Sequence, residues 1–527
     1  MAHKILTHEQ ITQVFSSPFC LSIFFLLSVL IVFKLAIRKS KTNLNQPPSP
    51  PKLPIIGNLH QLGTLPHRSL RDLSLKYGSV MLLQFGQKQT LVISSADVAM
   101  EMMKNHDVAF SNRPQNIAAK IILYGCSEIV FGHYGENWRQ KRKISVIELL
   151  SMKSVQSFGE NRKEEVDELV NKLREVSSNN ACVNLSDMLI STINNIVCKC
   201  AIGKKYEDNN VKELSRKILH YLSAFLVGDY FPLLSWVDNL SGKIGKIKES
   251  FQEQDALFDK VIEERLALMK IENDEFKKKG FVDILLQLRE DGKLEFELSN
   301  NDIKGIIKVY LLSSFSLILL KFKDMLVGGT DTTATTLEWA FSELMRHPII
   351  MKKAQEEIRR VVGHKLQVEE SDINQMHYLK CVVKETLRLH PPGPLLVPRE
   401  TISNVKLKGY DIPAKTMVYV NTWAIQRDPK NWENPEVFMP ERFQHNQVDF
   451  KGQDFQFIPF GFGRRGCPGS NFALAMVESV LASLLYWFDW KLPETSSSMQ
   501  HVDMSEVFAL ALTKKEPLLV EPIAFSF

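Results

Sequence analysis

The sequence lacks a large excess of charge of either sign, and it lacks a cysteine pattern. It has 65 lysines and arginines against 60 aspartates and glutamates, a net charge of +5 in 527 residues. This near balance gives no indication that the partner is a nucleic acid. The mild basicity would suit an acidic protein partner. The seven cysteines are odd in number and scattered, which predicts no disulfide framework and fits a reducing compartment.

Interior linkers are also absent. No stretch between residues 60 and 520 is rich enough in proline, glycine or serine to divide the chain, although its length would allow three or four domains of about 150 residues. We therefore expect one large domain over residues 59–527.

The N-terminal stretch lacks charge. Residues 10–33 carry no charged side chain, and a helix from about residue 13 would cross a bilayer core of about 30 Å. The basic residues that follow are Lys34, Arg38, Lys39 and Lys41. They place the following chain in the cytosol by the positive-inside rule. We prefer an uncleaved anchor and basic flank, residues 1–40, to a signal peptide, because the basic cluster follows the apolar run and no small-residue cleavage site is evident.

Prolines dominate the next segment, residues 41–58. The run Pro47–Asn58 cannot be helical and predicts a stiff extended spacer. Such a hinge would hold the domain at a fixed attitude to the membrane. An ordinary disordered linker is the alternative.

The remaining periodicity predicts a mainly α fold with small β-sheets, an α+β class. Strands are expected at Val80–Phe85 and Thr90–Ser94, and helical spacing dominates from about residue 135 to 290. In Phe225–Leu240, Pro232 should separate two helices. This apolar stretch is expected either as an exposed loop that lies on a membrane or lines a substrate path, or as buried packing.

Phe460–Gly469 places one cysteine in a glycine-rich loop beside two arginines. A thiolate can bind haem iron and favour oxygen activation, so Cys467 is the candidate axial ligand. Glycines allow a flat cofactor to approach, and Arg465 is the better candidate for a haem propionate. A free buried cysteine is the alternative.

The same loop spells a dinucleotide fingerprint, Gly461-x-Gly463-x-x-Gly466. That interpretation requires a strand, a helix and a second parallel strand around the glycines. Cys467-Pro468 follows at once and only about sixty residues remain, so we reject it.

Asp324–His347 predicts a long helix with an unusual centre of glycines and threonines. Because these residues weaken a helix, their presence calls for a reason. Asp331 and Thr332 together could relay protons to a reacting oxygen. The alternative is a helix N-cap, with Asp331 starting a shorter helix.

Two further pairs share helical faces. Trp138 and Arg142 are four apart and would offer an indole N–H and a guanidinium to one anion, whereas Glu385 and Arg388 are three apart. Each pair alone is weak evidence, since basic helix turns and surface ion pairs are common.

Together, these motifs resemble the cytochrome P450 superfamily over essentially the whole chain. Its haem-binding signature is matched by Phe460, Gly463, Arg465, Cys467 and Gly469. Glu385 and Arg388 match its K-helix pair, and Arg442 in Pro440–Phe443 matches the partner that closes that buried network. The segment around Asp331 and Thr332 matches its oxygen-activation motif, and Trp138 and Arg142 match its C-helix pair.

The anchor, hinge and haem loop are most similar to plant microsomal A-type members. That resemblance implies a single-pass endoplasmic-reticulum monooxygenase with haem b, which uses O2 and electrons from NADPH through a separate reductase, with cytochrome b5 as an optional partner. The substrate would be a small lipophilic metabolite. Residues implied to hold the haem propionates are Trp138, Arg142, Arg399 and Arg465. Segments implied to shape the pocket are Phe225–Leu240, Asn116–Tyr124, Pro394–Val397 and the turn near Phe508 and Ala509.

One segment departs from the family. Val309–Lys323 separates Asn301–Lys308 from Asp324–Gly328, which would otherwise form one continuous helix start. Fifteen helical residues would turn the upstream face by about 60° and add about 22 Å. The apolar part is too short for a second membrane span. We interpret the segment as extra coding sequence from an intron edge, looped out of the helix.

Two other functions compete with the monooxygenase. One is a P450-like isomerase or dehydratase that needs neither O2 nor a reductase, against which the intact Asp331 and Thr332 argue. The other is an inactive haem-binding product, caused by the insert at Val309–Lys323.

Overall fold

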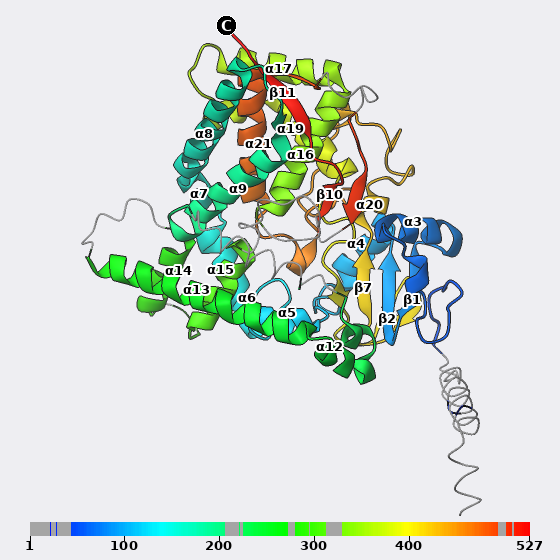
Figure 1. The fold of residues 1–527 in the computed structure, drawn as a ribbon. Coiled ribbons are helices and arrows are strands. Elements are labelled where there is room, and N and C mark those ends of the chain that lie inside the picture. Colours follow the sequence, from blue (N-terminus) through cyan, green and yellow to red (C-terminus); the bar gives the residue numbers. More distant parts are fainter. Residues whose placement is uncertain are drawn as a thin grey trace, which may run out of the picture.

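The computed structural model describes most of the chain (Figure 1). The described residues are 44–205, 225–271, 280–292, 296–311, 329–493, 502–508 and 511–526, with Ser22, Ser28, Tyr221 and Leu294 as single positions. The predicted anchor at 1–40, apart from the two serines, therefore lies outside the described residues. The same holds for residues 312–323 of the insert, for Asp324–Gly328 and for Ala509.

Helices make up most of the described chain, and the predicted mainly α class is confirmed. The α-helices are α3 (Pro66–Tyr77), α4 (Ala96–His106), α5 (Ile117–Ile122), α6 (Glu136–Ile144), α7 (Met152–Ser157), α8 (Gly159–Ser178), α9 (Leu185–Ile202), α11 (Val227–Tyr230), α12 (Trp236–Leu240), α13 (Lys243–Ile271), α14 (Phe281–Glu290), α15 (Asn300–Leu311), α16 (Asp331–Arg346), α17 (Pro348–Val362), α18 (Glu370–Ile373), α19 (His377–Leu389), α20 (Thr422–Ile425) and α21 (Ser470–Trp487). Shorter helical turns are η1 (Leu59–Gln61), η2 (Ser145–Leu149), η3 (Pro232–Leu234), η4 (Pro440–Phe443) and η5 (Gly463–Arg465).

The strands form small separate sheets. They are β1 (Val80–Phe85), β2 (Lys88–Ile93), β3 (Val183–Asn184), β4 (Arg399–Glu400), β5 (Val405–Leu407), β6 (Tyr410–Ile412), β7 (Met417–Val420), β8 (Phe488–Lys491), β9 (Glu506–Phe508), β10 (Leu512–Lys514) and β11 (Leu519–Ala524). The largest sheet has the order β1-β2-β7-β4. Its first two strands pair antiparallel, with Val80 opposite Ile93, which confirms the predicted strand pair.

The proline-rich segment is docked on that sheet. The Leu82 amide donates to the Pro48 carbonyl at 2.9 Å, and Asn58 is fully buried and accepts from the Gln84 amide at 2.8 Å. Residues 48–58 are therefore a fixed edge of the domain rather than a free linker. The boundary between hinge and haem domain at residue 58 stays a prediction.

The interior of the helical part is built from α9, α16, α19 and α21, which pack together in Figure 1. Two of them, α9 and α21, are long and apolar enough to cross a membrane, but most of each is buried inside the protein. Their apolar sequence is thus explained by the core.

The predicted helix Asp324–His347 needs correction. Among the described residues, Gly329 and Thr330 form a turn, and α16 begins at Asp331. This is the alternative of a shorter helix. Its physical reason is the weak helix propensity of glycine and threonine, together with the favourable place of a carboxylate at a helix N-terminus.

The open question at Phe225–Leu240 has a divided answer: Leu226 is fully buried in packing against α5, whereas the part from Pro232 onward is mostly exposed. Pro232 separates α11 from α12 as predicted. Leu233 and Leu240 are 81% and 79% exposed, and Trp236 is 55% exposed. Large apolar side chains gathered on one short segment indicate a contact surface.

Candidate haem-binding site

The cysteine loop connects η5 to α21. The Cys467 amide donates to the Phe460 carbonyl at 2.8 Å, and the Gly466 amide donates to the Gly463 carbonyl at 3.0 Å. These bonds fold the loop tightly just before α21 begins at Ser470. Burial raises the pKa of the Cys467 thiol, whereas the Gly469 amide and the charge of Arg142 oppose that rise. The Gly469 amide and Arg142 thus offset only part of the cost of burying a thiolate, and the pKa of the thiol stays above its usual value.

Gly463 is required by its surroundings. Its φ is +64°, and a Cβ there would lie 2.5 Å from Oδ1 of Asp107. The Asp107 carboxylate accepts from the Arg464 amide at 3.1 Å and from the Arg464 side chain at 2.8 Å. The family-signature glycine therefore lets a buried carboxylate fasten the loop.

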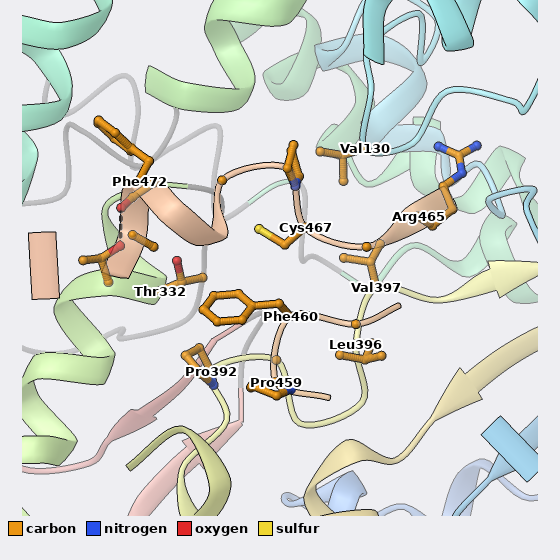
Figure 2. A pocket seen from close by; sticks show the side chains of 18 of the residues that line it. Val130, Thr332, Pro392, Leu396, Val397, Pro459, Phe460, Arg465, Cys467 and Phe472 are labelled. Carbon is orange, nitrogen blue, oxygen red and sulfur yellow. Dashed lines mark hydrogen bonds between the residues drawn. The ribbon is translucent and has the colours of Figure 1, made fainter. Parts of the chain in front are cut away.

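A mostly apolar cavity of about 250 Å³ opens at Cys467. Figure 2 shows the sulfur facing the space between Phe460, Thr332 and Phe472. Predicted site residues that line the cavity are Cys467, Phe460, Gly469, Arg142, Arg399, Arg465 and Thr332. Four of them belong to the loop Phe460–Gly469, and the fold brings Arg142, Thr332 and Arg399 from distant parts of the sequence to the same space.

Three predicted guanidiniums reach this cavity from different elements. Arg142 of α6 donates to the Gly466 carbonyl, and Arg399 of β4 donates to the Phe462 carbonyl at 2.6 Å. Arg465 donates to the Ser111 carbonyl at 2.6 Å. Burial, with the repulsion of other arginines, lowers the pKa of Arg465 to about 9, and burial lowers that of Arg399 to about 10. Such crowded cations would be stabilised by an anionic ligand.

Sequence reasoning missed a fourth guanidinium, Arg113. It is 5% exposed, lines the cavity and donates to the Val130 carbonyl at 3.1 Å and the Pro398 carbonyl at 2.9 Å. Burial and the neighbouring arginines lower its pKa well below the usual range. Its only signal in the sequence is an arginine before a proline in an otherwise uncharged stretch.

Trp138 differs from its predicted role. Its indole N–H donates to the Ile129 carbonyl at 2.9 Å and not to an anion shared with Arg142. Its ring instead lies under the guanidinium of Arg465, 4.1 Å from the ring centroid. In this arrangement Trp138 supports a cavity-lining arginine. Direct contact between Trp138 and haem stays a prediction.

The threonine-rich turn forms the opposite wall. Gly329, Thr332, Thr333 and Thr336 line the cavity, whereas Asp331 is not among its lining residues. The Thr333 hydroxyl donates to the Gly329 carbonyl at 2.7 Å, and the Thr336 hydroxyl donates to the Thr332 carbonyl at 2.8 Å. Thr332 therefore lies on the wall that faces the cysteine loop. Asp331, the preceding residue in the sequence, does not line the cavity.

Glu385, Arg388 and Arg442 form a buried charge network. Arg388 binds both oxygens of Glu385, at 2.8 and 2.9 Å, and Arg442 reaches Glu385 at 3.0 Å. Glu385 and Arg388 are fully buried. The interpretation of that pair as an ordinary surface bridge is therefore excluded.

Two predicted pocket segments do not line this cavity. α5, within Asn116–Tyr124, buries Ala119 and Ile122 against Leu226 and Ile247, so its apolar face is used for packing. No described residue of Phe225–Leu240 lines the cavity either. From the other predicted segments, Leu396 and Val397 do line it. Near the predicted turn at Phe508 and Ala509, the lining residue is Ala511.

The residues present fit a haem. A thiol faces an apolar space that could accept a flat macrocycle, and four guanidiniums could pair with its carboxylate edge. A family model described as Cytochrome P450 matches residues 47–520.

The chain belongs to the cytochrome P450 family.

Its relatives include plant P450 enzymes of similar length. A phenylacetaldehyde oxime monooxygenase of Prunus mume is 50% identical, over 95% of this chain and 94% of the relative. Cytochrome P450 71A1 of Persea americana is 48% identical, over 88% of this chain and 90% of the relative. This P450 is accordingly a monooxygenase of the plant type, with a haem-thiolate cofactor.

The fold is also that of a solved zebra fish cytochrome P450 structure with abiraterone. The TM-score is 0.72 at 23% identity, over 88% of this chain and 100% of that one. The predicted P450 fold is confirmed.

Proposed function

We propose that this P450 oxidises a small lipophilic specialised metabolite, with Cys467 as the axial thiolate and Asp331 and Thr332 on the proton path. The observation that carries the proposal is the placement of Cys467 and Thr332 around one apolar cavity. When bound, a haem-thiolate supplies oxygen activation. The chain's own residues would then orient the substrate, exclude water and hold a proton at the Thr332 hydroxyl.

We further propose that the protein is an endoplasmic-reticulum enzyme with its catalytic domain in the cytosol. Support comes from the sequence of residues 1–40 and from the exposed apolar side chains of α12 and η3. The tip of the β1–β2 hairpin touches this region, since the Gln87 amide donates to the Tyr230 carbonyl at 2.9 Å. Exposed apolar side chains near the start of the domain, which follows the predicted anchor, suit contact with a membrane surface.

Electrons are proposed to come from NADPH through a reductase, with cytochrome b5 as an optional partner. α6 contacts the cysteine loop through Arg142 and carries exposed Arg139 and Lys143. Arg464 of the loop has a side chain that is 48% exposed. These cations lie on the cysteine loop and on the helix that contacts it, and they suit an acidic electron-transfer partner.

The test is turnover of the full chain in membranes that contain a plant NADPH reductase. Phenylacetaldehyde oxime is the first compound to try, since a relative is named for it, followed by terpenoids, phenolics and alkaloids. The expected result is NADPH-dependent oxidation of at least one compound. Turnover without NADPH would favour the isomerase alternative. Absence of the red-shifted absorption of the reduced carbon-monoxide complex would favour the inactive product that the insert suggests.

A further inference from the structure

The loop between α5 and α6, residues 127–132, serves as an acceptor for cavity-lining arginines. The Ile129 carbonyl accepts from Trp138 at 2.9 Å and from Arg465 at 3.3 Å. The Val130 carbonyl accepts from Arg113 at 3.1 Å, and the Gly132 carbonyl accepts a second Arg465 nitrogen. The shape of this short loop therefore sets the direction of two guanidiniums.

Glu128 closes the loop. Its carboxylate accepts from the Val130 amide and, at 2.7 Å, from the Phe131 amide, while its carbonyl accepts from the Gly132 amide at 3.1 Å. Glu128 is 1% exposed. A Cβ at position 132 would lie 2.2 Å from the Glu128 carbonyl oxygen, so only glycine fits there. The fold thus keeps a buried carboxylate directly behind the carbonyls that hold the arginines.

The charge of Glu128 acts on the same arginines. Burial raises its pKa, while the two amide donors and the charges of Arg465 and Arg113 lower it. Among the described residues, no ion pair shorter than 4 Å involves Glu128. The single negative charge of Glu128 thus acts on two buried guanidiniums, those of Arg113 and Arg465. A net positive charge is left, which an anionic ligand could balance.

The loop is also braced from outside. Lys141 of α6 donates to the Ser127 carbonyl at 2.7 Å and pairs with Asp302 of α15 at 2.5 Å. Gly305 of α15 has no side chain, and a Cβ there would lie 3.5 Å from that of Glu128. Two helices therefore hold Glu128 in place.

From this geometry we propose that Glu128 is a positioning residue for the cofactor. By closing the 127–132 loop and balancing part of the charge, Glu128 aims Arg113 and Arg465 at the haem carboxylates and slows haem release. The inference rests on the proposed site at Cys467. It concerns a residue that contacts neither substrate nor iron.

The experiment compares three variants of the full holoprotein in detergent. The measured quantity is the rate of haem transfer to an excess of a haem-scavenging apoprotein. Glu128→Gln, which keeps the shape and loses the charge, should release haem about ten- to a hundredfold faster, as expected for losing hydrogen bonds to a charged acceptor. Glu128→Asp keeps the charge and can still accept nearby amides as in an Asx turn, so it should stay within about threefold of wild type. Glu136→Gln, an exposed carboxylate of α6, should be unchanged.

A double-mutant cycle with Arg113→Gln separates positioning from general destabilisation. If Glu128 acts through Arg113, the double variant should release haem no more than about threefold faster than the faster single variant. The same cycle with Arg465→Gln tests the second arginine. The proposal would be overturned by a wild-type rate of haem release from Glu128→Gln, or by effects that are additive in both cycles. If Glu128→Gln does not fold, rapid haem loss from a folded Glu128→Asp protein would overturn it, and retention would support it. Failure of the site proposal itself would show as no thiolate spectrum in the unaltered chain.

Discussion

Cys467 carries the firmest residue-scale prediction. Cys467→Ser should abolish the red-shifted absorption of the reduced carbon-monoxide complex and the monooxygenase activity, because a hydroxyl does not replace the electron donation of a thiolate. The measurement is a carbon-monoxide difference spectrum on equal amounts of protein. The exposed cysteine Cys182 offers a matched control, and Cys182→Ser should keep the signal. Monooxygenase activity in Cys467→Ser would refute the ligand assignment.

Thr332 should show the opposite pattern. Thr332→Ala should keep haem and the thiolate spectrum but lower product formation on the order of 10²-fold, the lower end for loss of a proton-transfer group. The measurement is product formed per NADPH consumed. Thr336→Ala is a control on the same wall, since the Thr336 hydroxyl is bonded back to its own helix. Normal coupling in Thr332→Ala would remove it from the mechanism.

Residues whose role depends on local spacing could be predicted from the sequence. Cys467 and Glu385 stand in short motifs that a single chain displays. Arg113 and Glu128 could not be predicted, because their partners are backbone carbonyls and amides whose directions appear only after folding. The indole of Trp138 illustrates the same limit, since helical spacing gave its face correctly but not the acceptor it meets.

At the scale of elements, Glu385 joins α19 to η4. Glu385→Gln removes the charge that both Arg388 and Arg442 bind, and breaking such a buried network costs about 3–5 kcal/mol. We expect little folded protein, measured as yield and as the midpoint of thermal unfolding. Lys172→Gln disrupts the exposed pair with Glu168 in α8 and should cost less than about 1 kcal/mol. A Glu385→Gln protein as stable as this control would contradict the network's structural role.

Two buried lysines of α15 make a matched pair. Lys304 binds Asp255 at 2.8 Å and Asp259 at 2.6 Å. Lys308 has no carboxylate contact within the described residues. Its ammonium lies 3.1 Å from the Ile122 carbonyl and 4.2 Å from the centre of the Tyr124 ring. Burial lowers the pKa of Lys308 from 10.5 to about 7, with Asp255 opposing and Lys304 assisting that shift.

The lowered pKa of Lys308 has a definite sign for stability. Between about pH 7 and 10.5 the unfolded chain binds a proton that the folded protein has released, so this lysine makes stability rise with pH there. Below pH 7 its penalty is fully present. Lys308→Met should therefore stabilise the protein at pH 7 and flatten the rise, whereas Lys304→Met should destabilise it. Denaturant unfolding at several pH values is the measurement, and a Lys308→Met protein less stable at pH 7 would contradict the expectation.

The predicted elements are correct where the hydrophobic periodicity is strong. They are wrong where glycine or threonine interrupts a helix. β1 has the bounds that the alternation predicts, Val80–Phe85. The start of α16 was predicted too early, because apolar spacing continued across Gly329 and Thr330 while the backbone turned. The exposure of Leu233 and Leu240 could not be predicted, since an apolar stretch reads the same in a core and on a surface.

At the scale of the whole molecule, the predicted insert at Val309–Lys323 gives a test of its own. Deleting Val309–Lys323 joins Lys308 to Asp324 and should raise the fraction of protein with the thiolate spectrum, because the deletion restores the continuous helix start expected for the family and removes an apolar run from the sequence. The measurement is haem-thiolate absorbance per amount of purified protein, compared with the full chain. An equal fraction in the full chain would contradict this expectation. Abundant peptides from Val309–Leu320 in the native source would refute the intron-edge interpretation.

The docked segment at residues 48–58 has a practical consequence. It runs along β1, from Pro48 at Leu82 to Gly57 at Phe85, and so approaches the hairpin tip that touches α11. A protein truncated before Leu44 would keep this docked segment and the exposed side chains of Leu233 and Leu240. Truncation alone would therefore leave a surface that recruits detergent or a second copy, and a soluble preparation would also require polar substitutions on that surface.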